Sequence, residues 1–277
     1  MSGPETLGLG AIAAAASLIL VNGLLSLWLR LRMERQLLVA SARSIVQLTL
    51  LGYILVPVFG WGQPLPVLAL AVLMVVMAAR ASVGRVTRSY PHASRHAFVS
   101  LLIAGGVTAW IGTGLIVRPE PWWQPRYLLP FLGMILGNSL TGVSLGLDTC
   151  LERLDVGRGN VEALLAAGAT RQEAALPVAR ESIRVAMVPI INAMTVVGLV
   201  SIPGMMTGQL LGGTAPDQAA RYQILILFLI AAGTGLGAGL AILFALRSLF
   251  DGEHRLRADR LVGASLMGGS PARHGGR

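Results

Sequence analysis

The stretch YLLPFLGMILGNSLTGVSLGL, residues 127–147, contains no charged side chain. A helix rises about 1.5 Å per residue, so this stretch can cross the ~30 Å hydrocarbon core of a bilayer. Further apolar stretches that are long enough, or nearly so, lie at 7–29, 44–61, 64–79, 97–117, 186–203 and 222–246. The sequence therefore predicts an all-α polytopic membrane protein with about seven transmembrane helices.

The composition supports this class and excludes several kinds of chemistry. Of the 277 residues, 54% are hydrophobic and only 13% are charged, against about 25% charged in soluble domains. All 22 basic residues are arginine, so the chain lacks the lysine of an ATP-binding P-loop and of Schiff-base catalysis. We expect no enzyme activity and no bound cofactor, with ATP and Mg on a separate subunit if transport is ATP-driven. The single cysteine, Cys150, excludes an intrachain disulfide.

The distribution of arginines predicts the orientation. Nineteen of them fall in the segments that join alternate spans, within 30–43, 80–95, 153–184 and 247–277, whereas the opposite side has Arg118, Arg126 and Arg221. Cytoplasmic loops of membrane proteins are rich in arginine and lysine. We expect a bacterial plasma (inner) membrane protein with its N-terminus outside and its C-terminus in the cytoplasm. The net charge of +9 is then explained without nucleic acid.

The chain reads as one transmembrane permease domain over residues 1–250, with a cytoplasmic coupling loop at about 148–185. Residues 251–277 lose apolar periodicity and are rich in Gly, Ser, Pro and Arg towards the end. Such a composition is typical of disorder, so this segment is expected to be a disordered cytoplasmic tail.

The loop at 148–185 carries helix boundary signals. Asn160 is a candidate N-cap, Gly168 is a candidate C′ residue, and Thr170 with Glu173 has the spacing of a capping box. These signals predict two short helices separated by a glycine. A helix lying across the cytoplasmic face is what a permease needs to receive force from an ATPase, and the spacing of Glu162 and Gly168 resembles the EAA loop of ABC importer permeases, although the following Leu-Pro comes four residues earlier. The alternative is an ordinary amphipathic connector.

The stretch LGMILGNSLTGVSLGLD, residues 132–148, resembles the signature of the FetB (UPF0014) family, the membrane subunits of iron-export ABC transporters. Further resemblance lies in Arg43-x-x-x-Gln47, in 164–177, in 197–209 and in 221–224. The resemblance implies a homodimeric permease that exports a metal ion and pairs with a separate ABC ATPase subunit. It places the coupling residues at Glu162, Gly168, Ala169, Thr170 and Glu173.

Several polar residues are candidates for the translocation pathway. Four of them fall within about a third of the helix circumference in the fifth span, which predicts a polar stripe that either lines a pathway or bonds neighbouring helices. Arg43 and Gln47 lie one turn apart at the start of the second span. The alternatives for them are a gate, a pairing of Arg43 with Asp148, or an Arg43 side chain that only extends to the membrane interface. Three further candidates lie in an irregular outer segment, 203–213. The alternatives for this segment are an outer gate, weak metal contacts or a packed turn. The candidates are Asn138, Thr141, Ser144 and Asp148 in the stripe, Arg43 and Gln47, Asn192 in the sixth span, and Met205, Met206 and Gln209.

The sequence does not supply an intramembrane iron site. Iron(II) favours imidazole and carboxylate ligands, but all four histidines fall in predicted cytoplasmic segments and the span cores lack Asp and Glu. The histidines are His92, His96, His254 and His274. The metal ligands therefore stay unknown: a site could form at the cytoplasmic mouth, the ion could pass by weak oxygen and thioether contacts, or the substrate is not a bare metal. Two rival functions are a gradient-driven transporter or channel, which the lack of intramembrane acids disfavours, and a non-transporting scaffold.

Overall fold

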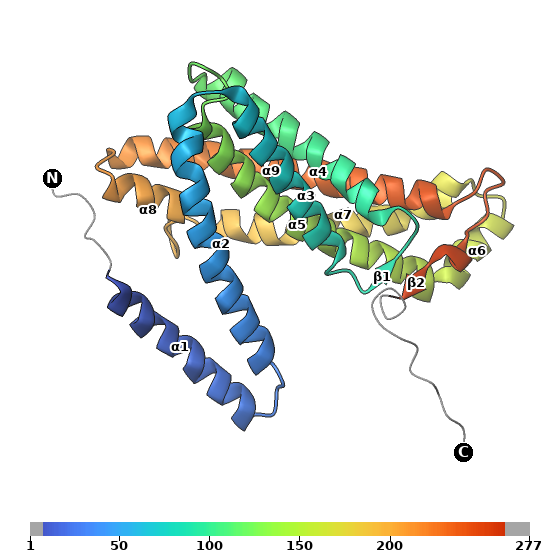
Figure 1. Cartoon of the computed structure of the whole chain (residues 1–277). Helices are drawn as coiled ribbons and strands as arrows, with labels where there is room; N and C mark the ends of the chain where they lie inside the picture. Colours follow the sequence, from blue (N-terminus) through green and yellow to red (C-terminus); the bar gives the residue numbers. More distant parts are fainter. Residues whose placement is uncertain (1–7, 264–277) are drawn as a thin grey trace. The chain divides into compact units, whose positions relative to one another are not determined.

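The computed structural model describes residues 8–263, and in this part the chain is almost entirely helical (Figure 1). The elements in order are α1 (Leu9–Trp28), α2 (Glu34–Trp61), α3 (Pro64–Val83), β1 (Arg88–Ser89), α4 (Ala93–Trp110), the π-helical turn η1 (Ile111–Val117), α5 (Pro125–Val156), α6 (Arg158–Ala166), α7 (Arg171–Val196), α8 (Gly204–Leu211), α9 (Pro216–Leu249), the 3-10 turn η2 (Ala258–Arg260) and β2 (Val262–Gly263). The predicted all-α membrane fold is confirmed.

The chain forms two compact units. Unit 1 comprises Met1–Gln63 and Gly208–Ala215, and its main described part is the hairpin of α1 and α2. The turn of this hairpin is closed by Ser26, whose hydroxyl accepts a hydrogen bond from the Met33 N–H at 3.0 Å and donates to the Glu34 carboxylate at 3.2 Å. Ser26 is buried although the helices around it are exposed, so this one hydroxyl fixes the turn.

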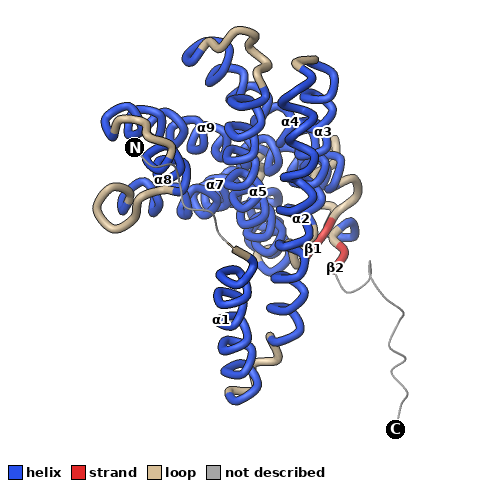
Figure 2. Tube along the Cα trace, turned by 60° about the vertical axis from the view of Figure 1, so that its left-hand side comes forward, coloured by secondary structure: helices blue, strands red, loops and turns tan. Residues whose placement is uncertain are grey.

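Unit 2 comprises Pro64–Thr207 and Pro216–Arg277 and holds most of the core. α5 is its central helix, because it contacts α3, α4, α7 and α9 (Figure 2 shows these helices as blue tubes). Buried residues of α7 recur every fourth position, which is the pattern of one helix face against a core. They are Ala174, Val178, Ser182, Ala186 and Ile190.

Two glycines let the central helices approach closely. A Cβ at Gly142 would lie 2.5 Å from the Thr234 Cγ2 of α9 and 3.1 Å from the Ala186 carbonyl of α7. A Cβ at Gly146 would lie 3.2 Å from both the Ala186 Cβ and the Ile242 Cδ1. Small residues at helix contacts are typical of membrane bundles, where close packing replaces the hydrophobic drive between helices.

Six helical segments are long and apolar enough to cross a membrane, and they correspond to all predicted spans except the sixth. That span was expected at 186–203, but α7 runs from Arg171 to Val196, so it begins in the predicted coupling loop and ends earlier. The chain turns at Gly198, which has φ +82°, and the Gly198 N–H donates to the Ser201 carbonyl.

The direction of the helices indicates that α7, which contains the sixth predicted span, also crosses the membrane and brings the total to seven. α5 and α9 run parallel, since residues 142 and 143 of α5 meet residues 234 and 237 of α9. A chain that crosses the membrane in α5 must return before it crosses in the same direction in α9. α7 packs along both of them and starts beside the end of α9, where the Arg171 N–H donates to His254. It is therefore the returning helix, although its polar first half keeps it below the hydropathy of the other spans.

Candidate functional site

The connection from α6 to α7 is a sharply defined turn. Gly168 has φ +91°, a conformation that favours glycine, and its N–H donates to the Leu165 carbonyl while the Ala169 N–H donates to the Leu164 carbonyl. These two bonds form a Schellman motif, which satisfies the free carbonyls at the end of α6. Thr170 then caps α7, since its hydroxyl accepts from the Glu173 N–H at 3.3 Å and the Glu173 carboxylate accepts from the Thr170 N–H at 2.8 Å. The predicted helix, glycine break and capping box are confirmed.

Two details of the loop differ from the sequence prediction. The N-cap of α6 is Gly157, so Asn160 lies inside the helix rather than at its start. Asn160 follows two residues, Arg158 and Gly159, that already adopt helical geometry. The second helix is not short, because α7 continues without a break into the bundle. The predicted turn is therefore continuous with the long helix α7, which contains Pro177 and Pro189.

α6 buries little of its surface against the rest of unit 2 and exposes most of it. Val161 is its one buried residue, and the helix packs mainly against α5 and α7. Its exposed side chains are small or acidic around the turn, and Glu162 forms an ion pair with Arg158 at 2.6 Å in which both side chains are about half exposed. Exposed ion pairs of this kind contribute little to stability. α6 is thus a flat, accessible element of about 14 Å at one end of unit 2.

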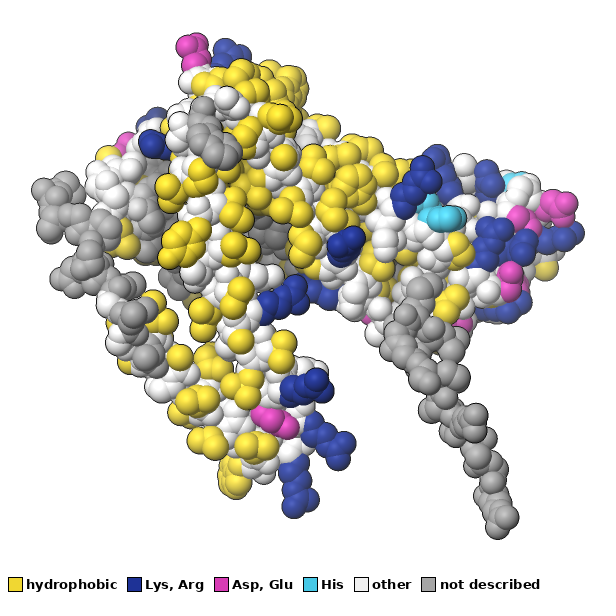
Figure 3. All heavy atoms as spheres, in the orientation of Figure 1, with side chains coloured by type: hydrophobic (Ala, Val, Ile, Leu, Met, Phe, Trp, Pro, Cys, Tyr) yellow, Lys and Arg dark blue, Asp and Glu magenta, His cyan; other side chains and the backbone are white. Residues whose placement is uncertain are grey.

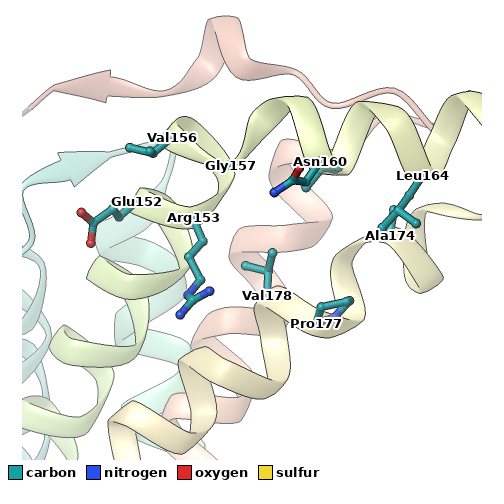
Figure 4. Close-up of a pocket in the computed structure, with 10 residues that line it drawn as sticks. Glu152, Arg153, Val156, Gly157, Asn160, Leu164, Ala174, Pro177 and Val178 are labelled. Atoms are coloured by element: carbon teal, nitrogen blue, oxygen red, sulfur yellow. The ribbon is translucent and has the colours of Figure 1, made fainter.

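A cavity of about 440 Å³ lies between α6, the end of α5 and the start of α7 (Figure 4). In the close-up, α6 supplies Asn160 and Leu164, and α7 supplies Ala174, Pro177 and Val178. The remaining lining comes from Val161 and the α5 end, with Glu152, Arg153, Val156 and Gly157. α6 therefore has open space between it and the end of α5 and the start of α7.

The end of unit 2 that carries α6 is its basic end, formed by residues 84–92, 157–170 and 250–263 (the dark blue and cyan cluster in Figure 3). Here the loop after α3 is tied to α5: the Asp148 carboxylate accepts from the Thr87 N–H at 2.8 Å and hydroxyl at 2.6 Å, and Arg88 pairs with Asp155 at 2.7 Å. Asp148, predicted as a pathway acid, therefore holds a loop in place.

Residues 251–263 form a brace across the basic end. They were expected to be disordered, but β2 pairs with β1, matching Arg88 with Gly263, and Phe250 bridges to Leu256. The brace also reaches α7, because His254 Nδ1 accepts from the Arg171 N–H at 2.9 Å. The prediction missed these pairings because they join segments that are far apart in the sequence, and the segment itself has no apolar periodicity. The rest of the predicted tail, with His274, lies outside the described residues.

Hydrogen bonds set the electrostatics of this end. The pKa of Glu173 is lowered because its carboxylate accepts hydrogen bonds from the backbone and hydroxyl of Thr170. The pKa of Asp251 is lowered chiefly by the backbone N–H of Arg255, 2.8 Å from its carboxylate. Burial raises the pKa of Tyr90, the residue between β1 and α4. The Glu173 carboxylate thus caps α7, and the Asp251 carboxylate holds the loop after α9.

The predicted polar stripe of α5 divides into two parts. Ser144 is buried and donates to the Ser82 carbonyl of α3 at 3.0 Å, so it bonds two helices together. Asp148 likewise accepts hydrogen bonds from Thr87. Of the two alternatives for the stripe, this half therefore bonds neighbouring segments of the bundle rather than lining a pathway. Asn138 is exposed and Thr141 half-buried, and both bond only to carbonyls of their own helix. These two face outwards from unit 2.

Asn192 lies level with Asn138. α5 and α7 are antiparallel, and the contacts of Gly142 and Gly146 with Ala186 place residue 144 opposite residue 186. Counting six residues along each helix in opposite directions brings Asn138 opposite Asn192. Both are exposed near the middle of the 32-residue α5. Polar side chains at this depth in a membrane protein face a bundle interior or a water-filled cavity.

The interior at this level holds polar groups that sequence analysis missed. Ser139 and Thr234 are buried, and their hydroxyls have no hydrogen-bond partner among the described residues. An ideal Cβ at Gly233 would lie 3.2 Å from the Thr108 hydroxyl and 3.3 Å from that of Ser139, which shows how closely α4, α5 and α9 meet. Serine and threonine in apolar helices are common, so no sequence signal distinguished these two.

The remaining candidates are not brought together by any observed contact. Arg43 and Gln47 are exposed residues of α2 in unit 1, and Asp148 belongs to unit 2, so the pairing of Arg43 with Asp148 stays a prediction. Met205, Met206 and Gln209 were expected in an irregular segment but lie on the short helix α8. No group of three or more His, Cys, Asp or Glu that could hold a metal ion occurs within residues 8–263.

Comparison with known proteins identifies the family. The model of the family described as "Uncharacterised protein family (UPF0014)" matches residues 9–250. A UPF0014 membrane protein of Synechocystis sp. is 37% identical over 80% of this chain and 83% of its own length. The "Probable iron export permease protein FetB" of Escherichia coli is 29% identical over 91% of this chain and 95% of its own length. The "Protein ALUMINUM SENSITIVE 3" of Arabidopsis thaliana is 30% identical over 78% of this chain and 77% of its own length. No solved structure matches the chain significantly. With its helical membrane fold, the chain belongs to the UPF0014 family of membrane proteins.

Proposed function

We propose that this protein is the membrane-spanning permease subunit of an ATP-driven ABC exporter that moves iron or a related metal ion. The E. coli relative, which covers nearly the whole chain, is named as a probable iron export permease. The chain has no lysine for a P-loop, so ATP and Mg would bind to a separate ATPase subunit. The observation that carries the proposal is the exposed α6 with its capped turn, joined directly to the spanning helix α7.

We propose that the basic end of unit 2 faces the cytoplasm of a bacterial cell. The connections at this end carry most of the arginines of unit 2, whereas Arg118, Arg126 and Arg221 belong to the opposite end. Arginine-rich ends of membrane bundles face the cytoplasm. In this orientation α6 would lie on the side where a cytoplasmic ATPase can reach it, and the N-terminus of the chain would lie outside.

The ATPase would dock on α6 and on the turn from Gly168 to Glu173. Pressure on α6 would be passed through the Schellman turn and the capping box to the first turn of α7. The cavity behind α6 leaves room for the movement, and the 26-residue α7 would carry it to the level of Asn192. Glu162, Gly168, Ala169, Thr170 and Glu173 are therefore the proposed coupling residues.

The substrate would pass along the outward face of α5 and α7. Asn138, Thr141 and Asn192 provide carbonyl and hydroxyl oxygens near mid-membrane, where an exposed amide is costly against lipid. A second copy of the chain facing this surface would enclose these groups in a polar pathway. Iron would then be transferred through weak oxygen contacts, which suits a substrate that must leave its site again.

The test is co-purification with the ATPase encoded beside the permease gene, followed by ATP hydrolysis in proteoliposomes with and without iron(II). Iron-stimulated hydrolysis supports an ATP-driven metal permease. A complex whose hydrolysis ignores iron contradicts the substrate, and failure to form any complex contradicts the ABC assignment and favours a gradient-driven transporter.

Two glycine variants test the coupling turn. Gly168 and Gly159 both have open space where a Cβ would be added, but only Gly168 has a positive φ. Gly168→Ala should strain the turn by about 1–2 kcal/mol and lower substrate-stimulated hydrolysis, and Gly168→Pro should abolish it, with membrane insertion intact. Gly159→Ala is the matched control and should behave like the wild type. Equal coupling in all variants would place the ATPase contact elsewhere.

A further inference from the structure

The turn between α1 and α2 carries an unbalanced positive charge. Residues 30–43 contain four arginines and one acid, Glu34, whose carboxylate accepts the Ser26 hydroxyl. All six ion pairs of the described chain lie in unit 2, so within residues 8–263 none of these arginines has an acidic partner. Figure 3 shows basic side chains gathered at this end of the hairpin. The turn therefore offers charge for an external anion.

Three of the arginines line one cavity. Arg32 comes from the turn, and Arg35 and Arg43 come from α2 at positions eight residues apart, which fall on the same helix face. The cavity is an open depression of about 590 Å³ on the surface of α2, since all its lining residues are exposed, and the others among them are Gln36, Val39 and Ala40. Guanidinium groups bind phosphate oxygens through paired N–H donors. The cavity thus combines three phosphate-binding groups with a partly apolar wall.

The helix lengths place this cavity at the level of lipid headgroups. α2 has 28 residues and is about 42 Å long, which exceeds the ~30 Å hydrocarbon core by about eight residues. Its apolar part ends at Trp61, so the excess falls on the first turns, which contain Arg35. Arg43 follows about two residues further in, a position from which a long arginine side chain extends to the headgroups. α1 has 20 residues and just spans the core, so the turn after Trp28 also lies among headgroups. Trp28 is 81% exposed, as is typical of interfacial tryptophan.

Apolar side chains accompany the arginines. Leu31, Leu38 and Val39 are each more than half exposed beside the charged residues. A soluble phosphate would satisfy the guanidinium groups but leave these side chains against water. A lipid satisfies both, because its phosphodiester meets the arginines while its acyl chains cover the apolar wall.

We propose that Arg32, Arg35 and Arg43 form a binding site for the phosphodiester headgroup of an anionic membrane lipid. The site lies in unit 1 and is independent of the transport function proposed above. Each arginine near an anionic lipid surface strengthens binding by about fivefold. Replacement of all three should therefore weaken binding of an anionic lipid by about 100-fold, since the three contributions multiply.

The experiment uses the full chain purified in detergent and titrated with cardiolipin, phosphatidylglycerol or phosphatidylcholine, with bound lipid counted by native mass spectrometry. The test variant is Arg32→Gln/Arg35→Gln/Arg43→Gln. The matched control is Arg85→Gln/Arg95→Gln/Arg247→Gln, which removes the same charge from unit 2 at arginines that form no ion pair in the described part of the chain. Thermal unfolding in the same detergent checks folding, and Arg32→Gln/Arg35→Gln is used if the triple variant does not fold.

We expect the test variant to lose binding of both anionic lipids, the control to keep it within about twofold, and phosphatidylcholine binding to be unaffected by either. Equal losses in the two variants would show that only net charge matters and would overturn the site. In a second arm, inorganic phosphate and the chain-free headgroup glycerophosphoglycerol compete with phosphatidylglycerol. Displacement at the same concentration as the lipid itself would show a site for a soluble phosphate and would overturn the lipid assignment.

Discussion

Replacement of Gly142 by alanine tests the packing of the central helices. The added Cβ would lie 2.5 Å from the Thr234 Cγ2 and 3.1 Å from the Ala186 carbonyl oxygen. The first contact is closer than carbon atoms approach without strain, and the second is to backbone, which cannot rotate away. Inserting a methyl group into such a site typically costs about 1–3 kcal/mol. We therefore expect Gly142→Ala to lower the free energy of unfolding by about 2 kcal/mol.

The assay is reversible unfolding of the purified chain in mixed detergent micelles of rising SDS content. Gly137→Ala, five residues earlier on the same helix, is the matched control, because nothing lies within 4 Å of its added Cβ. Alanine is the better helix former, so Gly137→Ala should be neutral or stabilising by up to about 1 kcal/mol. The sign of the effect should thus differ between two glycines of one helix.

A rescue variant isolates the contact. Thr234→Ser removes the Cγ2 that meets the new Cβ, so Gly142→Ala/Thr234→Ser should be more stable than the sum of the single effects by at least about 0.5 kcal/mol. Equal effects of the Gly137 and Gly142 substitutions, or strict additivity with Thr234→Ser, would refute the assigned packing of α5 against α9.

Two further predictions concern the outward face and the coupling turn. Asn138→Leu/Asn192→Leu should abolish transport in proteoliposomes without lowering stability. The control Thr234→Val, which replaces a buried hydroxyl with no hydrogen-bond partner among the described residues, should leave transport intact. Retained flux in the asparagine variant would show that these residues are not part of the pathway. The pKa of Glu173 is lowered by its bonds to Thr170, so its stabilising effect is present above the ordinary carboxyl pKa and is lost as the pH falls through the lowered value. The difference in melting temperature between wild type and Glu173→Ala should therefore shrink below about pH 4, and a constant difference would contradict this cap.

The sequence predicted the elements that depend on local chemistry. Long uncharged stretches located six of the spans, although the structural helices extend up to about ten residues beyond the predicted bounds, and Gly168, Thr170 and Glu173 located the turn between α6 and α7. Each of these signals acts within one helix or one turn. The sixth span was misplaced because α7 mixes its charged first half with its apolar second half, so hydropathy alone divided one helix into a loop and a span.

The candidate site was predictable only in part, because its roles depend on which helix faces which. Asn138, Thr141, Ser144 and Asp148 share one face in sequence, but only the contacts with α3 and Thr87 show that the last two hold the bundle together. The match between Asn138 and Asn192 needs the register of two antiparallel helices, which is set by Gly142 and Gly146 packing on Ala186. A single sequence contains these residues but not their register.

The brace at residues 251–263 ties the separate segments of the basic end to one another. It links the end of α9, the loop after α3 and the first residue of α7. In the proposed coupling mechanism, a push on the α6–α7 turn would therefore be shared among several helices instead of bending α7 alone. The family model matches residues 9–250, so the brace pairs a segment that follows the matched region with β1, which lies inside it.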